Sequence, residues 1–124
     1  MQTNAILRDY DGVFCVESFN PVLVKNSDPS FLRGQLGSWV AAKHVPSLLG
    51  RILLHNFITN IVSKPHFVAI CITHWTMSLV RFVPVFWKDI PLILWTVQSE
   101  KDALQARNDP RITAVIFEGF LPLI

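Results

Sequence analysis

The sequence has few charged residues and no cluster of basic ones. Charged side chains make up 16% of the 124 residues and hydrophobic side chains 51%, whereas about a quarter of an ordinary globular domain is charged. Lysine and arginine are scattered and the formal net charge is only +2, so the composition gives no indication of nucleic acid as a partner. So apolar a chain indicates strands buried on both faces, or a surface covered by a partner.

Cysteine is also scarce. Cys15 and Cys71 are the only two, and each lies in an apolar run without the spacing of metal ligands. Free cysteine is among the most buried residue types. We therefore predict two buried, reduced thiols.

The chain lacks targeting and membrane-spanning signals. Its first residues have no positive segment followed by an apolar core, so we expect no signal peptide and a cytoplasmic protein. Residues 45–62 form the most apolar window, but Gly50, Arg51 and His55 interrupt it, and a bilayer span needs ~20 apolar residues. Contact of this expected helix with a membrane surface, as a peripheral protein, is the alternative.

Short apolar runs alternate with helix-like stretches along the chain. Strands are expected at residues 12–19, 31–36, 66–73, 90–97 and 112–120, and helices at 20–28, 45–62, 78–88 and 99–108. Asn20 before Pro21, and Ser99 three residues before Asp102, have the pattern of helix N-caps. The alternation predicts an α/β domain with a parallel sheet covered by helices.

Polar residues gather where the apolar runs end. They are Glu17, Ser18, Arg33, Gln35, Thr73, His74, Trp95, Thr96 and Glu118. The carboxyl ends of parallel strands share one edge of the sheet, and ligands bind at that edge. Strands also end simply where polarity begins, so the pattern alone leaves both interpretations open.

Five stretches resemble the C-terminal half of glycerophosphodiester phosphodiesterases. They are YDGVFCVESFNPVLV, LRGQL, KPHFVAI, LILWTVQSEKDALQA and VIFEGFLP, in the family's order and from about Tyr10 to Pro122. The resemblance implies half of a (β/α)8 barrel, a fold that needs ~250 residues. Residues 1–124 would then be a partial domain of about four parallel strands with covering helices. Met1 would fall within the helix before the fifth family strand, which favours a truncated chain.

The family's catalytic motifs have no counterpart in our interpretation of this chain. His-Arg-Gly and His-Asp, which carry the family's catalytic histidines, do not occur, and we expect no equivalent of its Glu-x-Asp metal motif. The resemblance implies a lipid-metabolism enzyme that uses a divalent metal, Mg²⁺ or Ca²⁺, to hydrolyse glycerophosphodiesters to glycerol 3-phosphate and an alcohol. For this chain alone it implies the substrate-binding half, inactive by itself and without catalytic residues or a metal.

The resemblance suggests a substrate-binding role for six residues. They are Phe19, Trp95, Arg33, Gln35, Glu17 and Glu118. The two aromatic rings would cover the apolar side of a glycerol moiety. The arginine would contact the phosphate with the glutamine in support, and the glutamates would orient the arginine or bind hydroxyls. Each also has a structural alternative, such as core packing for the rings or ion pairing for the arginine.

An open half-barrel has two free sheet edges and an exposed apolar face. Besides a glycerophosphodiester-type ligand, the expected partners are therefore the missing N-terminal half or a second copy of the chain. A non-catalytic interaction module, or one that contacts a membrane surface, is the alternative function.

Overall fold

Five parallel strands follow one another across the molecule in chain order. The structure, a computed structural model, describes residues 2–37, 60–75 and 89–121. The strands are β1 (Cys15–Ser18), β2 (Leu32–Gly37), β3 (Phe67–Cys71), β4 (Leu92–Val97) and β5 (Ala114–Phe117). Each pairs in parallel with the next. The predicted α/β class and parallel sheet are confirmed, and the five strands agree with the five apolar runs, whereas the family resemblance implied about four.

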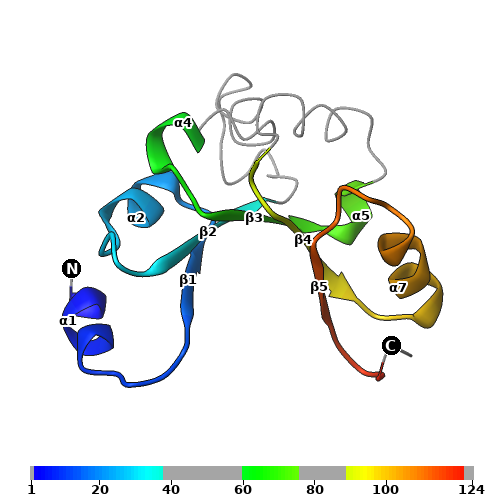
Figure 1. The fold of residues 1–124 in the computed structure, drawn as a ribbon, viewed down its shortest axis with the longest axis horizontal. Coiled ribbons are helices and arrows are strands. Elements are labelled where there is room, and N and C mark those ends of the chain that lie inside the picture. Colours follow the sequence, from blue (N-terminus) through cyan, green and yellow to red (C-terminus); the bar gives the residue numbers. More distant parts are fainter. Residues whose placement is uncertain (1, 38–59, 76–88, 122–124) are drawn as a thin grey trace, which may run out of the picture.

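The helices lie on the outer side of an arched sheet. They are α1 (Gln2–Arg8), α2 (Pro21–Asn26), α4 (Asn60–Ser63), α5 (Ile72–Trp75) and α7 (Glu100–Arg107). In Figure 1, α1 and α2 stand outside one end of the arch and α7 stands outside the other. The helix expected at 78–88 lies outside the described residues, as does most of the one expected at 45–62. None of the helices described is long and apolar enough to cross a membrane.

The two predicted N-caps are both present. The Asn20 side-chain oxygen accepts a hydrogen bond from the backbone N–H of Val22 at 2.9 Å, with Pro21 in the first turn of α2. The Ser99 hydroxyl oxygen accepts one from the backbone N–H of Asp102 at 3.2 Å. Such side chains satisfy N–H groups that the first turn of a helix leaves unpaired.

The third strand is shorter than predicted. The expected strand at 66–73 ends at Cys71, and α5 begins at the next residue. A short, continuously apolar run does not by itself distinguish a buried strand from a buried helical turn. The boundary was therefore placed two residues too late.

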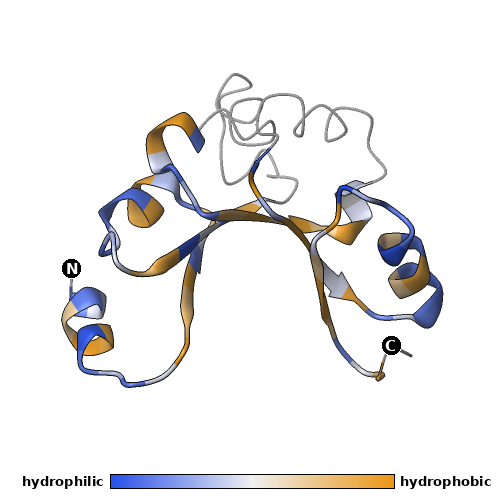
Figure 2. Ribbon diagram, in the orientation of Figure 1, coloured by the Kyte–Doolittle hydropathy of each residue, from blue (hydrophilic) through white to orange (hydrophobic). Residues whose placement is uncertain are grey.

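The hydrophobic core lies between the sheet and its helices. Val68, Leu92 and Leu94 pack there with Trp75 of α5 and Ala106 of α7. Figure 2 shows the apolar residues concentrated along the middle of the sheet. We call this side the helix-covered face. Because successive side chains of a strand point to opposite faces, the residues that alternate with this core belong to the other side, which we call the concave face.

Candidate functional site

An aromatic pair spans the concave face. Trp95 alternates with core residue Leu94 in β4, and Phe19 directly follows β1. Their ring centroids are 5.9 Å apart at an interplanar angle of 72°. Strands β1 and β4 are three places apart in the sheet, which is ~14 Å at the usual strand spacing. The two rings therefore meet because the sheet curves and both side chains reach across its inner side.

Trp95 offers a hydrogen-bond donor at this contact. Its indole Nε1 is a buried atom without a hydrogen-bond partner among the described residues. The ring is partly exposed and Phe19 is 48% exposed. An indole in this setting presents an apolar surface and one N–H, which together suit a small ligand with carbon and hydroxyl groups.

Glu17 stands on the concave face of the edge strand β1. It is in register with Gly34, which is in turn in register with Phe67. A Cβ atom on Gly34 would lie 2.3 Å from the Phe67 ring, so the ring lies directly over this glycine and only a residue without a side chain fits beneath it. Phe67 is 5% exposed. It therefore covers the residue that is in register with Glu17.

Cys15 shares that face with Glu17, and our prediction of a buried thiol here is wrong. Cys15 is exposed and Cys71 is partly exposed, and both are free thiols. The Cys15 thiol donates to the Glu17 carboxylate at 3.8 Å. The pKa of Cys15 is raised by partial burial, and further by the negative charge and the hydrogen bond of Glu17. Edge-strand position explains the exposure, because β1 has a neighbouring strand on one side only within the described sheet.

Glu118 lies at the same edge of the sheet, after β5. Its backbone N–H donates to the Val97 carbonyl at 3.0 Å, and its carboxylate accepts a hydrogen bond from the Gln98 amide at 3.2 Å. Glu118 is exposed. Glu118 thus follows the last strand of the sheet, whereas Glu17 lies on the first.

The structure places Arg33 away from the other predicted site residues. It is the second residue of β2 and in register with Val16, so it is not at the carboxyl end of its strand as expected. Its guanidinium Nη2 is 3.5 Å from the Lys64 carbonyl oxygen, and its backbone N–H donates to the His66 ring at 3.1 Å. The amino end of a parallel strand lies at the edge opposite to the one that binds ligands.

Gln35 is buried on the helix-covered face. It is 2% exposed and in register with core residue Val68. Its amide nitrogen donates to the carbonyl oxygens of Ser18 at 3.0 Å, Phe19 at 3.1 Å and Leu36 at 3.2 Å. The structure therefore places Gln35 behind the end of β1, in contact with the backbone that carries Phe19.

Cys71 and Thr73 are polar groups of this edge that our site prediction did not include. Cys71 is in register with Trp95, and its sulfur lies 3.1 Å from the Thr73 hydroxyl oxygen. The continuously apolar run Phe67–Cys71 gives no alternation that would assign Cys71 to a face. Pairing with β4 was needed to place it.

The described residues do not fit a divalent metal site. No three histidine, cysteine, aspartate or glutamate residues converge within ranges 2–37, 60–75 and 89–121, and hard cations take several oxygen ligands. Glu17 and Glu118 are each hydrogen-bonded to a neighbouring side chain.

A Glu-x-Asp sequence does occur, contrary to our expectation, at Glu100 to Asp102. It lies in the first turn of α7, where Asp102 bonds to the capping serine.

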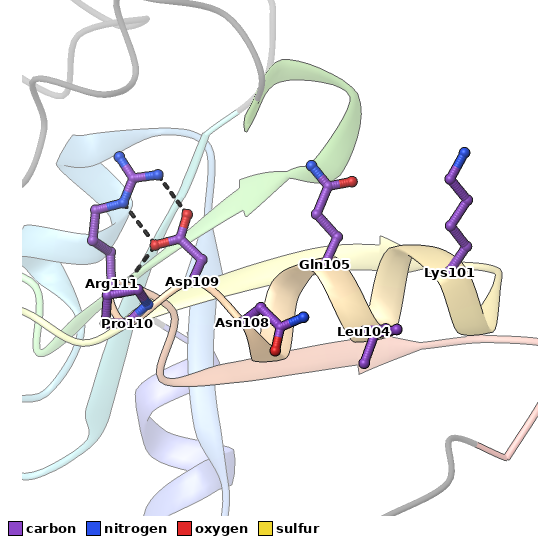
Figure 3. Close-up of a pocket in the computed structure, with 7 residues that line it drawn as sticks. All are labelled: Lys101, Leu104, Gln105, Asn108, Asp109, Pro110 and Arg111. Atoms are coloured by element: carbon purple, nitrogen blue, oxygen red, sulfur yellow. Dashed lines mark hydrogen bonds and ion pairs between the residues drawn. The ribbon is translucent and has the colours of Figure 1, made fainter.

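A separate open groove lies beside α7. Its volume is about 670 Å³, and it is lined by Lys101, Leu104, Gln105, Asn108, Asp109, Pro110 and Arg111. Figure 3 shows Arg111 paired with Asp109, with Nε and Oδ1 at 2.7 Å. The Arg111 guanidinium also lies 4.4 Å from the centre of the Trp75 ring, and its hydrogen bond holds the pKa of Asp109 below its usual value. None of the six predicted site residues lines this groove.

Comparison of the chain with models of known protein families, with curated proteins and with solved structures finds no match. The resemblance to glycerophosphodiester phosphodiesterases therefore stays a prediction that rests on the sequence stretches themselves.

Proposed function

We propose that this chain is the substrate-binding half of a glycerophosphodiester phosphodiesterase-type barrel, and that it holds the glycerol moiety of its ligand against Trp95 and Phe19. The observation that carries the proposal is the contact of these two rings across the concave face at 5.9 Å. The free indole N–H of Trp95 supports it, because a glycerol hydroxyl can accept that hydrogen bond. Glu17 and Glu118 are the carboxylates of the same edge that accept from ligand hydroxyls.

The order of the strands supports a half-barrel. A doubly wound sheet reverses its strand order at a switch point, whereas the strands here follow chain order throughout the part that the structure describes. The described helices stand on the outer side of the arch, which also suits a barrel wall (Figure 1). Catalysis is assigned to the missing half of the barrel, so this chain alone binds without hydrolysing.

A calorimetric titration with glycerophosphocholine tests the proposal. We expect the chain to bind it, and we expect Trp95→Ala to weaken binding about tenfold, because ~50 Å² of lost apolar contact at ~25 cal/mol per Å² is ~1.3 kcal/mol. Phe19→Ala should weaken it to a similar extent. Leu104→Ala is the matched control, since Leu104 is 59% exposed on α7 and should leave affinity unchanged.

The same samples separate binding from catalysis. With Mg²⁺ or Ca²⁺ added, we expect no release of glycerol 3-phosphate. Absence of binding by the folded wild-type chain would refute the site, and turnover that a chelator abolishes would refute the assignment of catalysis to the missing half.

The exposed apolar edge strand β5 favours a second candidate function, an interaction module. Ile116 and Phe117 of β5 are each 43% exposed, and edge strands of this kind pair with other chains. An assembly that forms without any affinity for glycerophosphodiesters would favour this candidate over the first.

A further inference from the structure

Gln35 is the most buried of the six residues predicted for the site, and it reaches none of the ligand-facing groups. Its side chain occupies the helix-covered face, whereas Phe19 and Trp95 meet on the concave one. Its amide nitrogen nevertheless donates to both the Ser18 and the Phe19 carbonyl oxygens. From the helix-covered face, Gln35 therefore hydrogen-bonds to the backbone that carries the Phe19 ring.

The rest of the loop is held equally closely. The Ser18 hydroxyl oxygen accepts from the backbone N–H of Asn20 at 3.1 Å, and the Asn20 side chain accepts from Val22 as the cap of α2. Phe19 thus lies between the end of β1 and the start of α2, where side chains bond to the Ser18 and Phe19 carbonyls and to the Asn20 N–H. Only its ring, 48% exposed, lacks such support and relies on contact with Trp95.

The orientation of the Gln35 amide follows from the acceptors around it. Its nitrogen faces three carbonyl oxygens, while its own oxygen has no hydrogen-bond partner among the described residues. The reverse orientation would set the amide oxygen against those carbonyls, which is repulsive. Replacing Gln35 by an apolar side chain would remove the donor to these partly buried carbonyl oxygens, and an acceptor left without its donor costs free energy.

We propose that Gln35 is the positioning residue of the concave face, and that it sets the place of the Phe19 ring against Trp95 through the Ser18 and Phe19 carbonyls. It does not touch the ligand. The ligand part of this inference rests on the proposed function, but the effect of Gln35 on the ring contact does not. A binding site gains affinity when its contact groups are held in place before the ligand arrives.

Fluorine NMR of the chain labelled with 5-fluorotryptophan tests the inference without a ligand. The Trp95 resonance is assigned as the one lost in Trp95→Phe, and Phe19→Leu shows where it moves when the neighbouring ring is gone. We expect Gln35→Met, which keeps the side-chain length and removes the donor, to move the Trp95 resonance toward its Phe19→Leu position. Gln105→Met, the same change on α7, should leave that resonance in place. An unmoved Trp95 resonance in folded Gln35→Met would overturn the proposal.

A second measurement on the wild-type chain covers the case in which Gln35→Met does not fold. The side-chain amide protons of Gln35 should exchange with solvent far more slowly than those of exposed Gln105, because they are buried and bonded to the loop. Exchange at the same rate as Gln105 would overturn the proposal. Titration with glycerophosphocholine then separates the two proposals: a wild-type chain that binds nothing refutes the proposed function, while the fluorine spectra still decide the role of Gln35.

Discussion

Asp28 joins the turn before β2 to helix α1. Its Oδ1 accepts from the backbone N–H of Ser30 at 3.0 Å and from the Ser30 hydroxyl at 2.8 Å. Its Oδ2 accepts from Arg8 Nε at 2.7 Å. The bonds from Ser30, followed by the one from Arg8, lower the pKa of Asp28 from its ordinary 3.8 to about 2. Through this one carboxylate, the first helix is fastened to the sheet.

This pKa predicts a loss of stability in acid. A carboxyl group with a lowered folded-state pKa stabilises the fold above its unfolded-state pKa, and that contribution disappears as the pH falls through the folded-state value. The free energy of unfolding of the wild-type chain should therefore approach that of Asp28→Asn between pH 3.8 and about 2. Urea denaturation at a series of pH values measures both. Curves that stay parallel through this range would contradict the prediction.

At the scale of the element, helix α7 is too short to be stable by itself. It has eight residues, and isolated helices shorter than about 12 residues are marginal in water. Its cap at Ser99 and the packing of Ala106 against the core supply the remaining stabilisation. Helix α7 leads into β5, and Glu118 follows β5. The position of Glu118 therefore depends on the Ser99 cap and on the packing of Ala106.

Removal of the cap should be measurable. Ser99→Ala loses the bond to the Asp102 N–H and leaves the Asp102 carboxylate without its 2.7 Å partner, so the free energy of unfolding should fall by about 1 kcal/mol. Ser99→Thr keeps the hydroxyl that accepts from the Asp102 N–H and donates to the Asp102 carboxylate, and is the matched control. Denaturant midpoints compare the three proteins, and a Ser99→Ala chain as stable as the wild type would count against this role of the cap.

At the scale of the whole molecule, the two edge strands of the sheet govern association with other chains. Strands β1 and β5 each have one neighbour within the described sheet, and Ile116 is an exposed apolar residue of β5. Unpaired strand edges readily add a strand from another chain, and lysine on an edge opposes this. On the proposal of a half-barrel, we expect the remainder of a barrel, or a second copy of the chain, to pair with these edges.

In the absence of that partner, we expect the purified chain to self-associate as its concentration rises. Sedimentation velocity over a dilution series measures the association. Ile116→Lys should reduce it, whereas Leu104→Lys, at an exposed leucine of α7, should not. A wild-type chain that sediments as a monomer at every concentration would show that these edges are closed by other means.

Local chemistry was sufficient to predict the five strands and the caps of α2 and α7, but not helices α1 and α5. Asn20 and Ser99 bond to N–H groups two or three residues away, so the sequence alone specifies where α2 and α7 begin. The alternation of apolar runs with helix-like stretches likewise predicted the parallel sheet, because buried strands and covering helices have different hydrophobic patterns. Of the site, the sequence identified the aromatic pair but only through the family resemblance.

What the tertiary structure decided was which side chains meet. The contact of Phe19 with Trp95 depends on the curvature of the sheet from β1 to β4. The separation of Arg33 from that contact depends on the register of β2 with its neighbours. The burial of Gln35 and the exposure of Cys15 also follow from how the strands pair. Register and curvature arise from pairing between distant segments, and a one-residue change of register exchanges the two faces of a strand. The sequence therefore determined the strands and their order along the chain, whereas only their packing decided which residues form the concave face.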